Sequence, residues 1–337
     1  QLEDHPIRMV VQIKDRIRLF LTRSVHDSHI STDKPKVTGL REYSEALVKN
    51  KKFDRFVEDF TDNWLDLRNI DFTSPDRTLF PEFDHYLKYS MLEETRAYVR
   101  RMFLENLPIS HLVKSDFAML NERLARHYGV AGVVGNTYRQ VALADETRGG
   151  LLGQSSVLML GSTGKDSHPI RRAVWLRDRL LNDPPAPPPP DVPDLDEMNP
   201  NFAKLSVREQ LEVHRNKESC ASCHRGIDPW GIALENFDAI GLFRTEVHQK
   251  PVVATDTLPN GTELDGVVSL KKYLVENRSE DFARALVSRL TVYALGRNLE
   301  LSDEDLIDDL TNEFERNDHL ILALIQNLVA SEAFQTK

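Results

Sequence analysis

Cysteine is scarce in this chain, with two residues, Cys220 and Cys223, among 337. Two cysteines are too few for a disulfide framework and supply only half of a four-thiolate zinc site. A dithiol redox pair of the thioredoxin kind would need a βαβ unit around it, and the surrounding pattern is helical. The pair therefore requires a different explanation.

Long apolar runs and an excess of positive charge are also lacking. No stretch approaches the roughly 20 apolar residues that cross a bilayer, so we expect no transmembrane segment in this chain. Lys and Arg number 43 against 53 Asp and Glu, which gives a net charge of −10. This balance is opposite to the basic surface that binds nucleic acid, although solubility alone explains a modest acidic excess. We expect no nucleic-acid partner.

A phosphate-binding loop is absent as well. The run Gly161-Ser162-Thr163-Gly164-Lys165 has the wrong spacing, and Asp166 follows where such a loop needs Ser or Thr. A second glycine-rich run, residues 148–154, has a backbone that glycine allows to approach a cofactor closely.

The two cysteines form a C-x-x-C-H motif that runs from Cys220 to His224. This motif is the attachment signature of a c-type haem. Two thiols on one helical turn can add to the two haem vinyl groups, and the next residue offers an imidazole to the iron. We predict one covalent haem c, with His224 as its proximal ligand.

Haem is attached to such motifs outside the cytoplasm, so the sequence predicts a periplasmic or otherwise extracytoplasmic location. An export signal has a charged and then an apolar stretch, whereas this chain begins Gln-Leu-Glu-Asp-His-Pro. We therefore expect residue 1 to be a processed end or a boundary within a longer protein.

Apolar residues recur at helical spacing along most of the chain, which predicts a mainly α fold. The helical pattern is interrupted by short β-like runs at 138–143 and 155–160. It is also interrupted by an extended segment over 246–265 that contains a Pro-Asn-Gly turn. After the motif we expect a turn at 228–231 and then a short helix. The other expected helices cover residues 7–22, two segments within 40–67, 82–104, 111–127, 168–181, 207–216, 269–277, 281–295, 303–315 and 320–334.

A proline-rich run divides the chain. Residues 183–198 begin Asp-Pro-Pro-Ala-Pro-Pro-Pro-Pro, which favours an extended polyproline II spacer. We expect an N-terminal helical domain over 1–129, and a glycine-rich segment and helix over 130–182. The linker then covers 183–198, and a cytochrome-c-like helical haem domain covers 199–337.

Recognisable motifs follow one another along the chain. They are Trp64-Leu65, Glu93-Glu94-Thr95, Asn121 to Ala125, His127-Tyr128-Gly129, Arg148 to Leu152, Leu205 to Arg215, the C-x-x-C-H motif, Ile227-Asp228-Pro229, Leu234 to Gly241, and Thr291 to Arg297. In this order they resemble the large planctomycete-type c-type cytochromes, which carry domains of unknown function 1592, 1588 and 1585. The resemblance covers nearly the whole chain and implies that it is the C-terminal part of a larger protein.

The sixth ligand of the iron is open. Small c-type cytochromes usually bring a methionine from downstream, but here the last methionine is Met198, which precedes His224. His214, on the helix that enters the motif, is the first candidate metal ligand; its alternatives are a propionate contact or a helix cap. An open or water-bound iron also fits. Lower-ranked candidates are Met159, His168, His248 and Tyr293.

Charged and aromatic residues near the motif are candidates for haem contacts. Guanidinium groups pair well with propionates, which suggests a role for Arg215, Arg225 and Arg244, although a solvated surface role fits each equally. Trp230 is a candidate for contact with the haem edge, with core packing as the alternative. We expect a structural role at turns and helix ends for Asp228, Asn236 and Asp238.

Electron transfer in the cell envelope, with a redox partner protein, is the function that these features favour. A haem peroxidase or oxidase with an open distal site is the second hypothesis. The third is a scaffold whose helical N-terminal region docks a partner enzyme. The iron distinguishes the first two, because a six-coordinate low-spin iron favours electron transfer.

Overall fold

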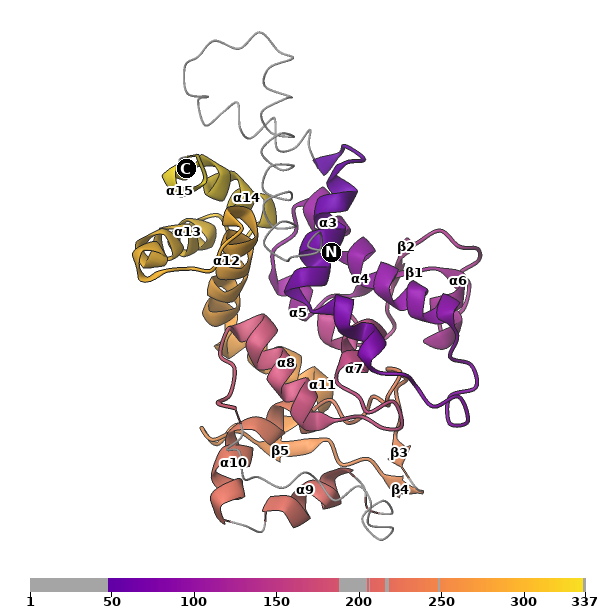
Figure 1. Ribbon diagram of the computed structural model, residues 1–337. Coiled ribbons are helices and arrows are strands. Elements are labelled where there is room, and N and C mark those ends of the chain that lie inside the picture. Colours follow the sequence, from indigo (N-terminus) through magenta and orange to yellow (C-terminus); the bar gives the residue numbers. More distant parts are fainter. Residues whose placement is uncertain (1–47, 188–204, 206, 216–217, 248, 336–337) are drawn as a thin grey trace, which may run out of the picture. The chain divides into compact units, whose positions relative to one another are not determined.

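The computed structural model describes residues 48–187, 205, 207–215, 218–247 and 249–335 (Figure 1), with the backbone alone for 207, 213–215 and 218–220. These residues form two compact units. The terminal unit combines residues 48–60, 102–109 and 283–335, and the central unit combines 61–101 and 110–282. Each unit takes residues from both sides of the proline-rich run, so the grouping differs from the expected boundaries at 129 and 199. Most of that run, and the expected helix over 7–22, lie outside the described residues.

Helices dominate both units, which confirms the mainly α prediction. Three helices contribute residues to both units: α3 (Phe53–Trp64), α4 (His85–Glu105) and α12 (Ser279–Leu295). The other helices of the central unit are η1 (Leu67–Phe72), α5 (Ser110–Val113), α6 (Glu122–His127), η2 (Leu151–Gly153), α7 (Ser155–Leu160), α8 (Pro169–Leu181), α9 (Val207–Arg215), α10 (Glu218–Ile232) and α11 (Gly266–Asn277). Those of the terminal unit are η4 (Leu301–Asp303), α13 (Glu304–Arg316), α14 (Ile321–Ala330) and α15 (Glu332–Gln335).

The strands of the central unit are short and form two-stranded antiparallel sheets. The pairs are β1 (Phe117–Leu120) with β2 (Arg139–Ala142), β3 (Glu246–Val247) with β4 (Lys250–Pro251), and β5 (Thr255–Thr257) with β6 (Glu263–Asp265). In the first pair Phe117 lies opposite Ala142, and Leu120 lies opposite Arg139. The expected turn before β6 is present, because Leu258 N donates to Thr262 O at 2.8 Å and Gly261 has a φ of +85°.

Two expected elements between the motifs were wrong. The single helix over 111–127 is instead α5, strand β1 and helix α6, and residues 155–160 form helix α7 where we expected a strand. All four residues of β1 are buried, and a fully buried apolar run has no periodicity that separates strand from helix. The Asn121 side chain then accepts from Leu124 N at 2.9 Å and so starts α6 as its N-cap.

Near the motif, the expected turn at 228–231 was also wrong, because α10 continues through Pro229 to Ile232. Proline in a helix removes one backbone donor, but Asp228, Pro229 and Trp230 are all buried, and tertiary packing overrides that cost. At the C-terminus the expected helix over 320–334 is divided at Ser331 into α14 and α15.

An aromatic cluster forms the core of the terminal unit. Phe53, Phe56 and Phe60 follow one another at spacings of three and four residues, which places them on one face of α3. The Phe53 ring lies 5.4 Å from Phe103 of α4, and the Phe60 ring lies 5.4 Å from Tyr293 of α12. Edge-to-face contacts at such distances stabilise a core beyond simple burial. Tyr293 is therefore a packed core residue of this unit.

The central unit has an apolar core that surrounds Met159. Members from distant parts of the chain are buried together: Ile70, Leu87, Met91, Ala118, Leu120, Leu124, Ala125, Met159 and Ile240. Met159 has no exposed surface. Its side chain fills this core, as methionine often does in irregular gaps.

Buried polar groups join α4 and α6 to the glycine-rich segment. The Tyr128 hydroxyl donates to Glu94 Oε2 at 2.6 Å, and the Arg148 guanidinium lies 3.7 Å from the centre of the Tyr128 ring. Burial raises the pKa of Glu94 to about 8, against the lowering effect of Tyr128 and Arg148. Beside them, burial lowers the pKa of His127 to about 4. The Nε2 atom of His127 lies 3.1 Å from Ile240 O, within hydrogen-bond distance.

The glycine-rich segment approaches its own chain closely. A Cβ atom at Gly149 would lie 2.0 Å from Ser115 O, and one at Gly150 would lie 2.3 Å from Val113 O. The side chain of Lys271 crosses from α11 and donates to Glu146 O at 3.0 Å and Thr147 O at 2.9 Å. These glycines are thus required for backbone packing against α5 and the residues after it, and an approach of this segment to a cofactor stays a prediction.

Glu94→Gln tests the buried carboxyl. The carboxyl has a pKa of about 8 in the folded state and 4.5 as its ordinary value. Between these values the unfolded state releases the proton while the folded state keeps it, so stability falls as the pH rises, by about 1.4 kcal/mol per pH unit. Gln cannot titrate, and its amide oxygen can still accept from Tyr128. The variant should therefore gain stability relative to the unsubstituted protein between pH 5 and pH 8.

Denaturant titrations at several pH values, followed by tryptophan fluorescence, measure this difference. The three tryptophans, Trp64, Trp175 and Trp230, all belong to the central unit. Histidine titrations are common to both proteins and cancel in the comparison. A difference that does not change with pH would show that Glu94 is ionised in the folded state.

Candidate functional site

Helix α10 carries the C-x-x-C-H motif. Positions 223 and 224 come three and four residues after position 220, so all three lie on one face of the helix. Cys223 is exposed, and the side chain of His224 is 16% exposed. The side chain of Cys220 lies outside the described residues. The helix therefore places both cysteine positions and the imidazole on the same side.

The His224 ring is held by a buried carboxylate on its own helix. Nδ1 of His224 lies 2.8 Å from Oδ1 of Asp228, whose side chain has 0% exposure. A carboxylate can only accept, so Nδ1 of His224 is the donor of this hydrogen bond. Histidines that ligate metals are commonly oriented in this way by a carboxylate.

Close contact between α10 and α8 fixes the position of the motif helix. A Cβ atom at Gly231 would lie 1.9 Å from the carbonyl oxygen of Pro169, the first residue of α8. The absence of a side chain at Gly231 thus allows the two helices to touch. His168 caps the start of α8, since its side chain accepts from Arg171 N.

A guanidinium group fixes the segment that follows α10. Arg172 of α8 is 2% exposed. Its Nη1 donates to Leu234 O at 2.8 Å and to Phe237 O at 2.7 Å, and its Nη2 donates to Asp238 O at 2.6 Å. These carbonyls belong to a stretch of turns, in which Leu234 O also accepts from Phe237 N at 3.0 Å and Asp238 O from Gly241 N at 3.3 Å. The buried cation therefore adds donors to the backbone hydrogen bonds of this stretch.

An ionic cluster next to it involves Arg244. Its Nη1 lies 2.7 Å from Asp166 Oδ1, and its Nη2 donates to Ser167 Oγ at 2.9 Å. Glu235 is 5% exposed and accepts from Ser167 Oγ at 2.9 Å. Burial raises the pKa of Glu235, against the effect of the nearby arginines. Arg244 is thus occupied by carboxylates of its own chain.

Three family models match the chain in succession. They are described as proteins of unknown function: DUF1592 over residues 19–130, DUF1588 over 148–247 and DUF1585 over 260–334. Together they are the domain set of the planctomycete-type c cytochromes. The chain belongs to this family. Comparison with curated proteins and with solved structures returned no match.

The C-x-x-C-H motif and the Arg172 anchor both lie within the second matched region. None of the helices in the described part of the chain combines the length and apolar character needed to cross a membrane. The motif residues that can be described fit a haem by their chemistry, because an exposed thiol stands next to an imidazole whose Nδ1 is bound by a carboxylate.

The other predicted haem contacts have different outcomes. Arg225 is exposed on α10. Trp230 is buried, its ring 5.8 Å from Tyr273 in an edge-to-face contact, and its contact with a haem edge stays a prediction. The side chains of His214 and Arg215 lie outside the described residues, as does His248.

Asp228 is the site residue that the sequence analysis misjudged. We expected Asp228 to fix a turn, whereas it lies in a helix and contacts His224. The spacing of four residues between the two was a usable signal, because such residues are neighbours on a helix. Asn236 and Asp238 have the expected structural roles: Asn236 Nδ2 donates to Arg244 O, and Asp238 Oδ1 accepts from the backbone of Ile240 and Leu242.

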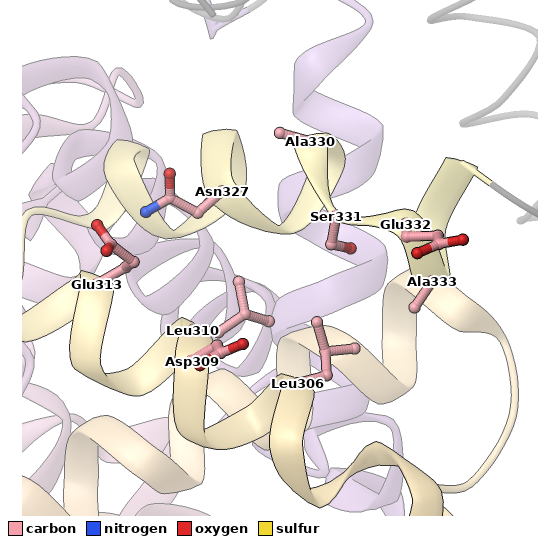
Figure 2. Close-up of a pocket in the computed structure, with 9 residues that line it drawn as sticks. All are labelled: Leu306, Asp309, Leu310, Glu313, Asn327, Ala330, Ser331, Glu332 and Ala333. Carbon is pink, nitrogen blue, oxygen red and sulfur yellow. The ribbon is translucent and has the colours of Figure 1, made fainter.

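A separate open cavity of about 620 Å³ lies in the terminal unit between α13, α14 and α15. Figure 2 shows Leu306 and Leu310 pointing into it from α13, with the carboxylates of Asp309, Glu313 and Glu332 near it. None of the residues that line it belongs to the predicted haem site.

Gly231→Ala tests the contact between α8 and α10. The new methyl group would overlap the Pro169 carbonyl, so one of the helices must move. We expect the central unit to lose about 1–3 kcal/mol of stability, measured by denaturant titration with tryptophan fluorescence. Gly226→Ala is a matched control on the same helix, where a Cβ atom meets nothing within 4 Å. It should be neutral or stabilising by up to about 1 kcal/mol. Equal stabilities of the two variants would contradict the close contact.

Proposed function

We propose that this planctomycete-type cytochrome carries one covalent haem c on α10 and transfers electrons in the cell envelope. One observation supports this above the others. The C-x-x-C-H motif lies on one helical face, and its histidine is held at Nδ1 by a buried carboxylate. When bound, the haem would supply reversible one-electron chemistry to a redox partner protein.

The roles of the motif residues follow from their chemistry. Cys220 and Cys223 would each form a thioether bond to the haem, and exposure of Cys223 leaves its thiol accessible for that reaction. His224 would bind the iron through Nε2, while Asp228 keeps its ring in place. Arg225 follows the histidine directly in sequence and is exposed, which makes it a candidate for contact with a propionate.

Packing of the upstream residues bears on the sixth position of the iron. Met159 is fully buried in the apolar core, and its removal from that core would leave a cavity that costs a few kcal/mol. His168 is committed to capping α8. These contacts favour His214, or an open position, as the arrangement on the second face of the haem. The open position would suit a peroxidase or oxidase rather than an electron carrier.

Covalent attachment is tested by denaturing gel electrophoresis with haem staining, on protein matured by a haem-attachment system. We expect the stain to migrate with the polypeptide. Cys220→Ser and Cys223→Ser should each leave at most a single-thioether product, with an altered absorption spectrum of the reduced protein. An unstained band from the unsubstituted protein would contradict the proposal.

The sixth position is tested by the absorption spectrum of the oxidised protein. We expect no trace of the weak far-red band that accompanies iron–methionine bonding, since no methionine follows His224 and Met159 is in the core. His214→Ala should convert a low-spin iron to high-spin if His214 is the ligand. Observation of the far-red band, and its loss in Met159→Leu, would show that methionine is the ligand after all.

A further inference from the structure

The Asp228 carboxylate is buried to a degree that requires an explanation. Its side chain is 0% exposed, and a carboxylate removed from water costs several kcal/mol unless it is paired and hydrogen-bonded. Its Oδ1 lies 2.8 Å from Nδ1 of His224. This hydrogen bond is therefore one of the contacts that compensate the burial of the carboxylate.

The pair is built into one helix. His224 and Asp228 are four residues apart on α10, so the backbone of a single turn sets the distance between the ring and the carboxylate. The carboxylate end of that turn is rigid, because Gly231 contacts Pro169 and the following segment is bound by Arg172. The geometry of the hydrogen bond is thus set by the helix itself.

We propose that Asp228 is a positioning residue that lowers the reduction potential of the haem iron through His224. This inference rests on the proposed attachment of haem to α10. The carboxylate draws the Nδ1 proton toward itself, which makes Nε2 a stronger electron donor. A stronger donor and a nearby negative charge of low exposure both favour the oxidised, more positive iron. The site is thereby adapted to give electrons to a partner at low potential.

Asp228→Asn tests this directly in the haem-loaded protein. Asn keeps the size of the side chain and an oxygen that accepts from Nδ1, but removes the charge. We expect the midpoint potential, measured by spectroelectrochemistry at equal haem content, to move to a more positive value. Glu276→Gln is the matched control, because it removes one negative charge from an exposed position on α11 of the same unit. It should leave the potential nearly unchanged.

Asp228→Glu completes the series, since it keeps the charge but lengthens the side chain. Its potential should lie closer to that of the unsubstituted protein than the potential of Asp228→Asn does. A purely structural role for Asp228 would not produce this order. An Asp228→Asn protein that retains its haem and has an unchanged potential would overturn the inference.

A second measurement covers the case in which Asp228→Asn fails to fold or to take up haem. Nitrogen NMR of the full chain with both Cys220→Ser and Cys223→Ser reports the tautomer of His224 without haem. We expect the proton on Nδ1, whereas a ring protonated on Nε2 would overturn the inference. This result is independent of the proposed function, which fails separately if the unsubstituted protein takes up no haem.

Discussion

The buried guanidinium of Arg172 is the interaction on which the geometry of the site depends. The chain after α10 makes no helix over residues 234–241, yet much of it is buried. Its carbonyl groups are satisfied in part by backbone N–H groups of the same stretch, for example Leu234 O by Phe237 N at 3.0 Å. Arg172 supplies donors to three of them, and burial lowers its pKa only to about 10, so it stays charged at neutral pH. This cation holds the downstream end of α10 against α8.

Other long basic side chains act in the same way elsewhere in the central unit. Arg148 donates to Gly153 O at 2.9 Å and to Gly241 O at 2.8 Å. Lys271 donates to the carbonyls of Glu146 and Thr147, which precede Arg148 in the chain. Several motifs that identify the family therefore have structural roles. Glu94, Tyr128 and Arg148 come from three separate motifs and meet in one buried contact. Such contacts bind loops that an apolar core alone would leave unpaired.

The motif helix combines a fixed end with an accessible one. Its last turn is held by Gly231, Trp230 and the Arg172 anchor, whereas Cys223 and Arg225 are exposed. An exposed thiol can be modified after the chain has folded around α8. His224 lies between the two ends and takes its orientation from Asp228, which belongs to the fixed part. The ring of His224 is thus held by a hydrogen bond, while the neighbouring thiol of Cys223 is exposed.

The sequence by itself was sufficient for the mainly helical fold, the C-x-x-C-H motif, the family, and helices with strong apolar periodicity such as α8 and α13. These features depend on local spacing, which is present in the order of the residues. Tertiary structure alone decided that residues 117–120 form a strand, that α10 continues through Pro229, and that the side chain of Asp228 is buried. The reason is physical: a short apolar run suits either conformation, and a proline or a carboxylate is tolerated only where packing compensates its cost. That packing depends on contacts between segments that are distant in sequence, and the local order of residues does not reveal these contacts.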